Sequence, residues 1–151
     1  MHNLGSFPDS ESSSFSTDSG RHMYEYQATV VQIIDGDTFI ASVDMGFYTY
    51  SHQHFRLLGY EAPETDGPEK LIGVLAKAKL EELMPVGTIV LVRVEKADSF
   101  GRWLAEVQWQ GETLSEYLIK LGYGLYRGRN DERPTFDLTK PYPFTPNQKA
   151  S

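Results

Sequence analysis

Three short stretches of the sequence bring charged side chains together where the chain is expected to turn. The first is Asp35-Gly36-Asp37-Thr38, which sets two carboxylates and a hydroxyl close to one another. Such oxygen donors suit a hard cation such as Ca²⁺. Because Asp-Gly is also a common hairpin turn, this stretch by itself favours an ordinary turn. A calcium loop of the EF-hand type is excluded, since its sixth and twelfth residues would be Ile40 and Gly46 instead of Gly and Glu.

The second stretch, residues 56–64, combines one cation with two carboxylates. Arg56 belongs to a strand-like run, and Glu61 and Glu64 lie on either side of Pro63. Proline holds the residue before it in an extended conformation, so both carboxylates can point to the same side of the turn. A solvated strand end is the alternative interpretation.

The third stretch is Asp98-Ser99-Phe100-Gly101-Arg102. Its glycine indicates a turn, which delivers Arg102 onto the strand face opposite Trp103. Taken alone, an arginine at the start of a strand is more often a surface charge. In combination, two arginines can bind phosphate oxygens while clustered carboxylates bind a divalent cation.

The elements that must position these stretches are mostly strands. Residues 26–34 are rich in β-branched side chains, and residues 38–43 return from the turn as the second strand of a hairpin. A third strand is expected at residues 54–58. Alternating apolar residues predict two more strands at residues 89–95 and 102–109.

Two amphipathic helices are also expected. The first lies between Pro68 and Pro85, and its apolar face comprises Ile72, Leu75, Ala76, Leu80 and Leu83. The second follows a capping box from Thr113 to Glu116 and ends at Gly122. The order β-β-β-α-β-β-α predicts an α+β, mainly β fold, namely a five-stranded OB-type β-barrel with two packed helices.

The composition divides the chain into three parts. Residues 1–23 are Ser-rich and without periodicity, and we interpret them as a disordered leader added ahead of the natural protein. Residues 24–133 hold the predicted barrel domain. Residues 134–151 contain four prolines and are expected to be a flexible tail. We find neither the pattern of a signal peptide nor a run of about 20 apolar residues that could span a membrane.

Charge and cysteine content exclude several classes of protein. The chain has 151 residues, a net charge of −7 and no cysteine. Disulfide scaffolds, thiolate metal sites and thiol nucleophiles are therefore excluded, and a generic basic nucleic-acid binder is disfavoured. An acidic net charge still allows a local site that binds phosphate groups through a few cations.

In order and spacing, the charged stretches resemble the staphylococcal nuclease (thermonuclease) family. The resemblance extends from about Gln27 to Tyr126, and the segments that carry it are Asp35-Gly36-Asp37-Thr38, Arg56-Leu57-Leu58, Ala62-Pro63-Glu64, Gly101-Arg102-Trp103-Leu104-Ala105 and Leu118-Ile119-Lys120-Leu121-Gly122. It implies a calcium-dependent phosphodiesterase on an OB-type barrel. Mg²⁺ or Mn²⁺ could replace calcium.

The resemblance also implies a role for each site residue. Arg56 and Arg102 would hold the scissile phosphate, and Glu64 would activate the attacking water. The expected metal ligands are Asp37, Glu61 and the backbone carbonyl of Ala62, with Asp35 as an acidic neighbour. Glu61 departs from the family, which usually has the shorter Asp there, so metal affinity or preference could differ.

Further residues are candidates for contacts with nucleic acid. Phe100 offers a stacking surface, and Tyr126 and Arg127 could stack on and neutralise a strand. For Tyr126 and Arg127, a core tyrosine followed by a solvated basic patch is an equally good interpretation. His52 and His54 lack an evident third zinc ligand and are expected to be exposed.

These observations predict a monomeric metal-dependent endonuclease that cuts DNA or RNA, preferably single-stranded, with little sequence specificity. A non-catalytic nuclease-like module that binds nucleic acid or protein is the alternative. The excess of acidic residues predicts weak non-specific affinity for nucleic acid, so binding should depend on the metal and the two arginines.

Overall fold

The computed structural model describes residues 24–97, 101–128 and 130–145, so the expected leader and the last part of the tail lie outside the described residues. The described strands are β1 (Tyr24–Asp35), β2 (Thr38–Asp44), β3 (Tyr50–Leu57), β4 (Ile89–Ala97), β5 (Trp103–Trp109) and β6 (Glu112–Thr113). The helices are α1 (Lys70–Leu83) and α2 (Leu114–Leu121), and a short 3₁₀ turn, η3 (Gly67–Glu69), precedes α1.

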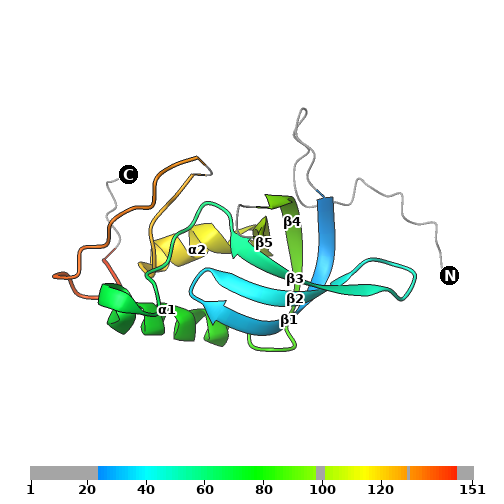
Figure 1. The fold of residues 1–151 in the computed structure, drawn as a ribbon, viewed down its shortest axis with the longest axis horizontal. Coiled ribbons are helices and arrows are strands. Elements are labelled where there is room, and N and C mark those ends of the chain that lie inside the picture. Colours follow the sequence, from blue (N-terminus) through cyan, green and yellow to red (C-terminus); the bar gives the residue numbers. More distant parts are fainter. Residues whose placement is uncertain (1–23, 98–100, 129, 146–151) are drawn as a thin grey trace.

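The first five strands form a closed barrel (Figure 1). Antiparallel pairing gives the order β3-β2-β1-β4-β5, and a parallel pairing of β3 with β5 closes the ring. This confirms the predicted OB-type α+β fold with two helices. The strand β6 was not predicted, because two residues carry no periodic pattern.

The core fills the barrel and extends beneath the helices. Alternate residues of the strands point inward, as period-two patterning requires. Phe39 and Phe55 stack at a centroid distance of 5.4 Å, and the largest fully buried side chains include Tyr60, Leu57, Leu80, Met84, Leu114 and Leu118. The predicted hairpin and helix positions thus place most of the expected core correctly.

Helix α1 buries a narrower face than its sequence pattern predicted. Its buried residues are Gly73, Ala76 and Leu80, while Leu75 is 50% exposed and was wrongly assigned to the buried face. Small residues at the contact let the helix approach the barrel closely. Larger side chains at the edge of its apolar face therefore remain exposed to solvent. Trp103, at the start of β5, is 36% exposed and lines a hollow together with Tyr24 and Tyr26.

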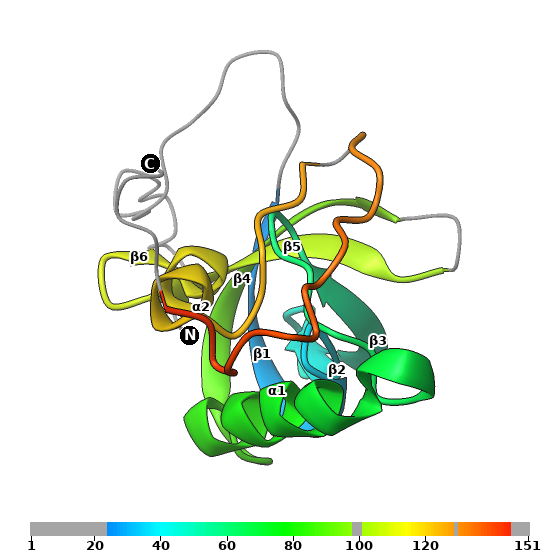
Figure 2. The ribbon, with the colours of Figure 1, turned by 90° about the vertical axis from the view of Figure 1, so that its left-hand side faces the viewer.

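Residues 134–145 pack against the domain, although their prolines predicted a flexible tail. They cross one end of the barrel close to both helices (Figure 2). Phe136 is buried, the Tyr142 hydroxyl donates to the Tyr123 carbonyl at 2.7 Å, and the Phe144 amide donates to the Gly122 carbonyl at 2.8 Å. Aromatic packing and these hydrogen bonds thus hold the segment against the domain, although it forms neither a helix nor a strand.

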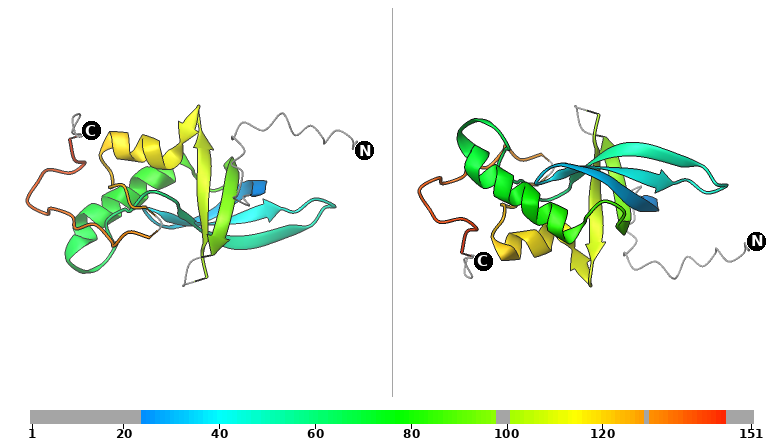
Figure 3. Two further views of the ribbon diagram at one scale, coloured as in Figure 1. Left: turned by 90° about the horizontal axis from the view of Figure 1, so that it is seen from above. Right: turned by 90° about the horizontal axis from the view of Figure 1, so that it is seen from below.

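The hairpin of β2 and β3 projects from the opposite end of the barrel (Figure 3). Its tip exposes Phe47 and Tyr48 almost completely. None of the helices in the described ranges has the length and apolar character needed to span a bilayer.

Candidate active site

The turn between β1 and β2 carries the first two carboxylates. Its central residue, Gly36, is buried where a Cβ atom would come within 2.7 Å of the Ala62 Cβ and 2.8 Å of the Ala76 Cβ. Only glycine therefore lets this turn rest on α1 and on the segment after β3. This close packing fixes the position of the turn and therefore the positions of Asp35 and Asp37.

Asp37 is the buried carboxylate of the site. It is 6% exposed, and its Oδ2 accepts a hydrogen bond from the Ala62 amide at 3.0 Å. Oδ1 accepts one from the Thr38 hydroxyl at 3.0 Å. Burial, reinforced by the neighbouring Asp35 carboxylate, raises the pKa of Asp37 to about 7, although Arg56 and the Ala62 amide act in the opposite direction.

Arg56 reaches this carboxylate from the neighbouring strand. In the β2–β3 ladder Arg56 lies opposite Thr38, and its Nη2 is 3.9 Å from the Asp37 Oδ2. The same nitrogen donates a hydrogen bond to the Glu61 carboxylate. The side chain of Arg56 is only 12% exposed, so these carboxylates limit its orientation.

Glu64 and Glu69 lie on the rim of the site. The side chain of Glu64 is 58% exposed, and its backbone amide donates to the Glu69 Oε1 at 2.8 Å. A Cβ atom on Gly73 of α1 would come within 1.8 Å of the Glu64 carbonyl oxygen. Helix α1 therefore contacts the backbone of Glu64 directly and helps to position it.

A pocket of about 190 Å³ joins these groups. Its lining residues are Asp35, Asp37, Arg56, Glu61, Ala62, Pro63, Glu64, Arg102, Arg127 and Arg133. All the catalytic and metal residues predicted from the sequence line this one pocket. Arg102 immediately precedes β5, and the parallel pairing of β5 with β3 brings it to the same pocket as Arg56.

The sequence of residues 54–139 matches the family of staphylococcal nuclease homologues, over more than half of the chain. The chain belongs to this family. The matched range includes the arginines and glutamates of the pocket, whereas Asp35 and Asp37 lie ahead of it. As a staphylococcal nuclease homologue, the protein is a member of a nuclease family that acts on nucleic acids.

In this nuclease homologue two further arginines enter the pocket from the segment after α2. Arg127 was predicted only as a contact with nucleic acid, and Arg133 was not singled out at all. Both are positioned by long-range contacts that no local pattern reveals. An antiparallel bridge between Glu61 and Leu125 brings the chain back to the pocket two residues before Arg127.

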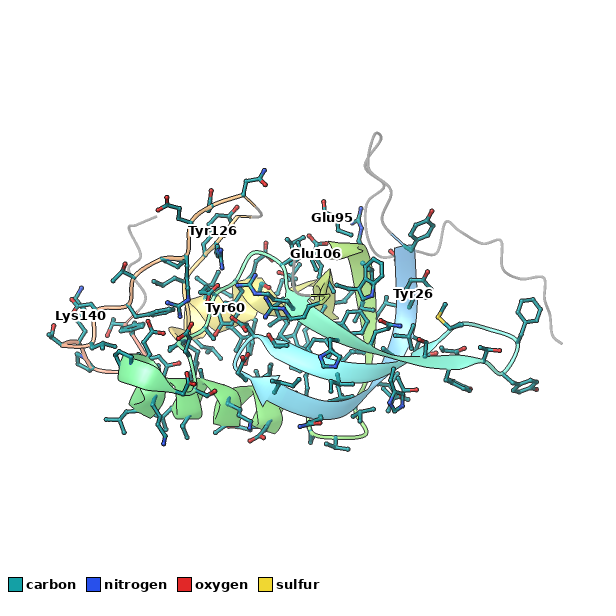
Figure 4. The ribbon with its side chains drawn as sticks, in the orientation of Figure 1. Tyr26, Tyr60, Glu95, Glu106, Tyr126 and Lys140 are labelled. Carbon is teal, nitrogen blue, oxygen red and sulfur yellow. The ribbon has the colours of Figure 1, made fainter. Side chains whose placement is uncertain are left out.

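Of the other two candidate contacts with nucleic acid, Tyr126 is not part of this pocket. Tyr126 is 67% exposed and lines a neighbouring hollow with Leu58 and Gly59. In Figure 4 Tyr126 lies near the outer edge of the molecule, and Tyr26 lies toward the opposite end of the barrel. Phe100 lies outside the described residues. His52 and His54 are exposed on β3, as expected.

Part of the expected calcium-binding set fits a cation. Asp35 and Asp37 form a carboxylate pair whose mutual repulsion a cation would relieve. Glu61 and the Ala62 carbonyl instead accept hydrogen bonds from arginines. No group of three or more His, Cys, Asp or Glu side chains suited to a metal occurs within the described ranges. The aspartate pair is therefore the part of the donor set that fits.

Proposed function

We propose that this protein is a metal-dependent endonuclease that hydrolyses phosphodiester bonds of DNA or RNA with little sequence specificity. We further propose that it acts as a monomer and prefers single strands. The observation that carries the proposal is the single pocket that Arg56 of β3 and Arg102, next to β5, line together with Asp37 and Glu64. Membership of a nuclease family supports the same conclusion.

The arginines match what phosphodiester hydrolysis requires. Addition of water to the phosphorus gives a five-coordinate species with more negative charge than the substrate. Arginine stays charged and presents a planar pair of donors to phosphate oxygens. Arg56 and Arg102 would hold the scissile phosphate from two directions and stabilise the charge that develops on it.

Glu64 is the proposed general base. Its side chain is more than half exposed at the pocket rim, so water can reach it. An ionised carboxylate within hydrogen-bond distance of a water molecule can accept its proton as the water attacks phosphorus. Glu69, which lies beside it, accepts hydrogen bonds from Arg133 at 2.7 and 3.1 Å and is less available for this role, whereas the Glu64 Oε2 is 3.9 Å from the Arg133 Nε.

A divalent cation, calcium in the first instance, would be held by Asp37 and Asp35. Once bound, it would offset charge on the phosphate and make water a stronger acid. Mg²⁺ or Mn²⁺ could occupy the same oxygen donors. The raised pKa of Asp37 supports this assignment, because a buried carboxylate beside another carboxylate gains most from a neighbouring positive charge.

One observation favours a second candidate, a nuclease-like module that binds nucleic acid without cutting it. Glu61, the expected second metal carboxylate, is engaged by arginines, and no three-donor metal cluster occurs in the described part of the chain. Such a module would keep a phosphate pocket and lose the cation. The presence of both Arg102 and Glu64 in one pocket is the reason that we prefer the catalytic proposal.

The proposal is tested by incubating the full chain with labelled single- and double-stranded DNA and RNA in Ca²⁺, Mg²⁺, Mn²⁺ or chelator. Glu64→Gln and Arg102→Met should each lower the cleavage rate by about 100-fold or more, since each removes a group that acts on the reacting phosphate. Glu81→Gln, an exposed change on α1, is the matched control and should cut at the rate of the unaltered protein.

Unaltered rates in both site variants would refute the catalytic proposal. If no metal supports cleavage while the oligonucleotide still binds, the binding module is the better account. Light scattering of the same sample tests the monomer assignment.

A further inference from the structure

Glu61 is a buried carboxylate with three arginine partners. Its side chain is 7% exposed. Oε1 accepts hydrogen bonds from Arg56 and from the Arg127 Nη1, the latter at 2.8 Å, and Oε2 accepts one from the Arg133 Nε at 2.7 Å. Both oxygens are thus occupied by guanidinium groups.

The three arginines come from two distant parts of the chain. Arg56 belongs to β3, whereas Arg127 and Arg133 both belong to the segment that follows α2. Glu61 and Leu125 exchange two backbone hydrogen bonds, of 2.8 and 3.0 Å, which bring Arg127 to the carboxylate. Glu61 is therefore the point where these segments meet.

Arg133 is also held on its far side. Its Nη1 and Nη2 donate to the two oxygens of Glu69 at 3.1 and 2.7 Å, and its guanidinium lies 5.3 Å from the centre of the Phe136 ring. Glu69 and Glu61 together fix the plane of this group. Such a two-sided arrangement positions an arginine for a third, anionic partner at low cost in side-chain entropy.

The formal charges of the residues that line the pocket balance without a metal ion. Four carboxylates line it (Asp35, Asp37, Glu61 and Glu64), and so do four arginines (Arg56, Arg102, Arg127 and Arg133). A phosphate group entering this pocket would meet donors from several guanidinium groups. A metal ion bound to either oxygen of Glu61 would compete with the arginine hydrogen bonds at that oxygen, and the incoming cation would face the arginines.

We infer that Glu61 is a positioning residue that holds Arg56, Arg127 and Arg133 as a phosphate-binding group, rather than a metal ligand. The inference rests on the proposed function, because it takes the phosphodiester to be the anion that enters. The protein then binds a nucleic-acid strand through four arginines even in chelator, and the cation is left to Asp35 and Asp37. This differs from the expectation, based on net charge and two arginines, that binding needs the metal.

Two binding measurements on the full chain separate the roles. Fluorescence anisotropy with a labelled single-stranded DNA oligonucleotide in chelator reports the affinity for phosphate, and calorimetry with Ca²⁺ alone reports the affinity for metal. Glu61→Gln and Arg133→Met should each weaken oligonucleotide binding by about tenfold or more, as expected for a lost charge-assisted hydrogen bond. Both should leave the Ca²⁺ affinity within about threefold, a change well below the tenfold expected for a lost charge-assisted contact.

Asp37→Asn should give the opposite result, with Ca²⁺ binding lost and oligonucleotide binding in chelator retained. Arg133→Lys should recover part of the affinity for the oligonucleotide, because it restores the charge but not the fork of donors. If burial of Glu61 prevents Glu61→Gln from folding, Arg127→Met and Arg133→Met carry the test, since both arginine side chains are 29% exposed.

The inference is overturned if Glu61→Gln weakens Ca²⁺ binding as strongly as Asp37→Asn does. It is also overturned if Arg133→Met raises Ca²⁺ affinity about tenfold only while Glu61 is present, because Glu61 would then be a metal ligand that the arginine restrains. Absence of oligonucleotide binding in chelator likewise contradicts it. Cleavage by the unaltered protein in Ca²⁺, measured in parallel, shows separately whether the proposed function holds.

Discussion

Among single residues, Glu69 shows how ion pairing at the pocket rim contributes to stability. Hydrogen bonds from Arg133, and then from the Glu64 amide, lower the pKa of Glu69 below its ordinary value of 4.5. A carboxyl with a lower pKa in the folded than in the unfolded chain holds fewer protons when folded. Its contribution is therefore fully present above pH 4.5 and is lost as the pH falls through the folded pKa.

Glu69→Gln should accordingly lower the free energy of unfolding at pH 7 by about 1–3 kcal/mol, the usual value of hydrogen bonds to a charged group. The difference from the unaltered protein should shrink at a pH below the folded pKa, because the carboxyl is then protonated in both states. Chemical denaturation at the two pH values measures this. An equal loss at both values would show that the charge of Glu69 contributes nothing.

The residue scale also shows where prediction from the sequence succeeds. Asp35, Asp37, Arg56, Glu64 and Arg102 lie next to turns or strand ends, so local patterns found them and the structure brings them to one pocket. Arg133 was missed because its place depends on a return of the chain near Leu125. No periodicity precedes it, and a neighbouring proline indicated only the end of the domain.

At the scale of elements, α1 supports the turn that carries Glu64. The helix buries Gly73 against the Glu64 backbone, where a methyl group has no room. The sequence predicted this helix correctly but assigned Leu75 to the wrong face, because an apolar stripe does not reveal how closely a helix approaches. The position of a helix is decided by its smallest residues as much as by its largest.

Gly73→Ala should therefore displace the Glu64 turn. We expect it to lower the free energy of unfolding by about 1–3 kcal/mol and to lower the cleavage rate, because the proposed base moves with the turn. Val74→Ala, at an exposed position of the same helix, is the control and should change neither quantity appreciably. Thermal unfolding and initial rates measure both effects, and an unaltered rate in Gly73→Ala would argue against positioning by α1.

The segment after Arg133 is the other element that the sequence described incompletely. Truncation after residue 133 removes the buried ring of Phe136 and the contacts of Tyr142 and Phe144 with the chain around Gly122. The free energy of unfolding should fall by at least about 2 kcal/mol, the usual contribution of one buried aromatic side chain. Denaturation curves that coincide with those of the full chain would instead place the end of the folded domain at residue 133.

For the whole molecule, the charge distribution matters more than its sum. The net charge of −7 predicts little attraction of a polyanion to the surface, while four of the seven arginines line one pocket. Affinity should thus come from few phosphate contacts. With about two to four contacts on single-stranded DNA, the slope of log K against log salt should be about −1.5 to −3. Anisotropy titrations over a range of salt measure it, and a much steeper slope would indicate a wider binding surface.

The central claim is that this pocket cuts phosphodiester bonds with the help of a cation held by Asp37 and Asp35. The most direct measurement is the initial rate of cleavage of labelled single-stranded DNA by the unaltered protein and by Asp37→Asn, in Ca²⁺ and then in excess chelator. We expect cleavage only by the unaltered protein in Ca²⁺, with both proteins still binding the strand. Cleavage that continues in chelator, or an Asp37→Asn variant that cuts at the unaltered rate, would contradict the claim.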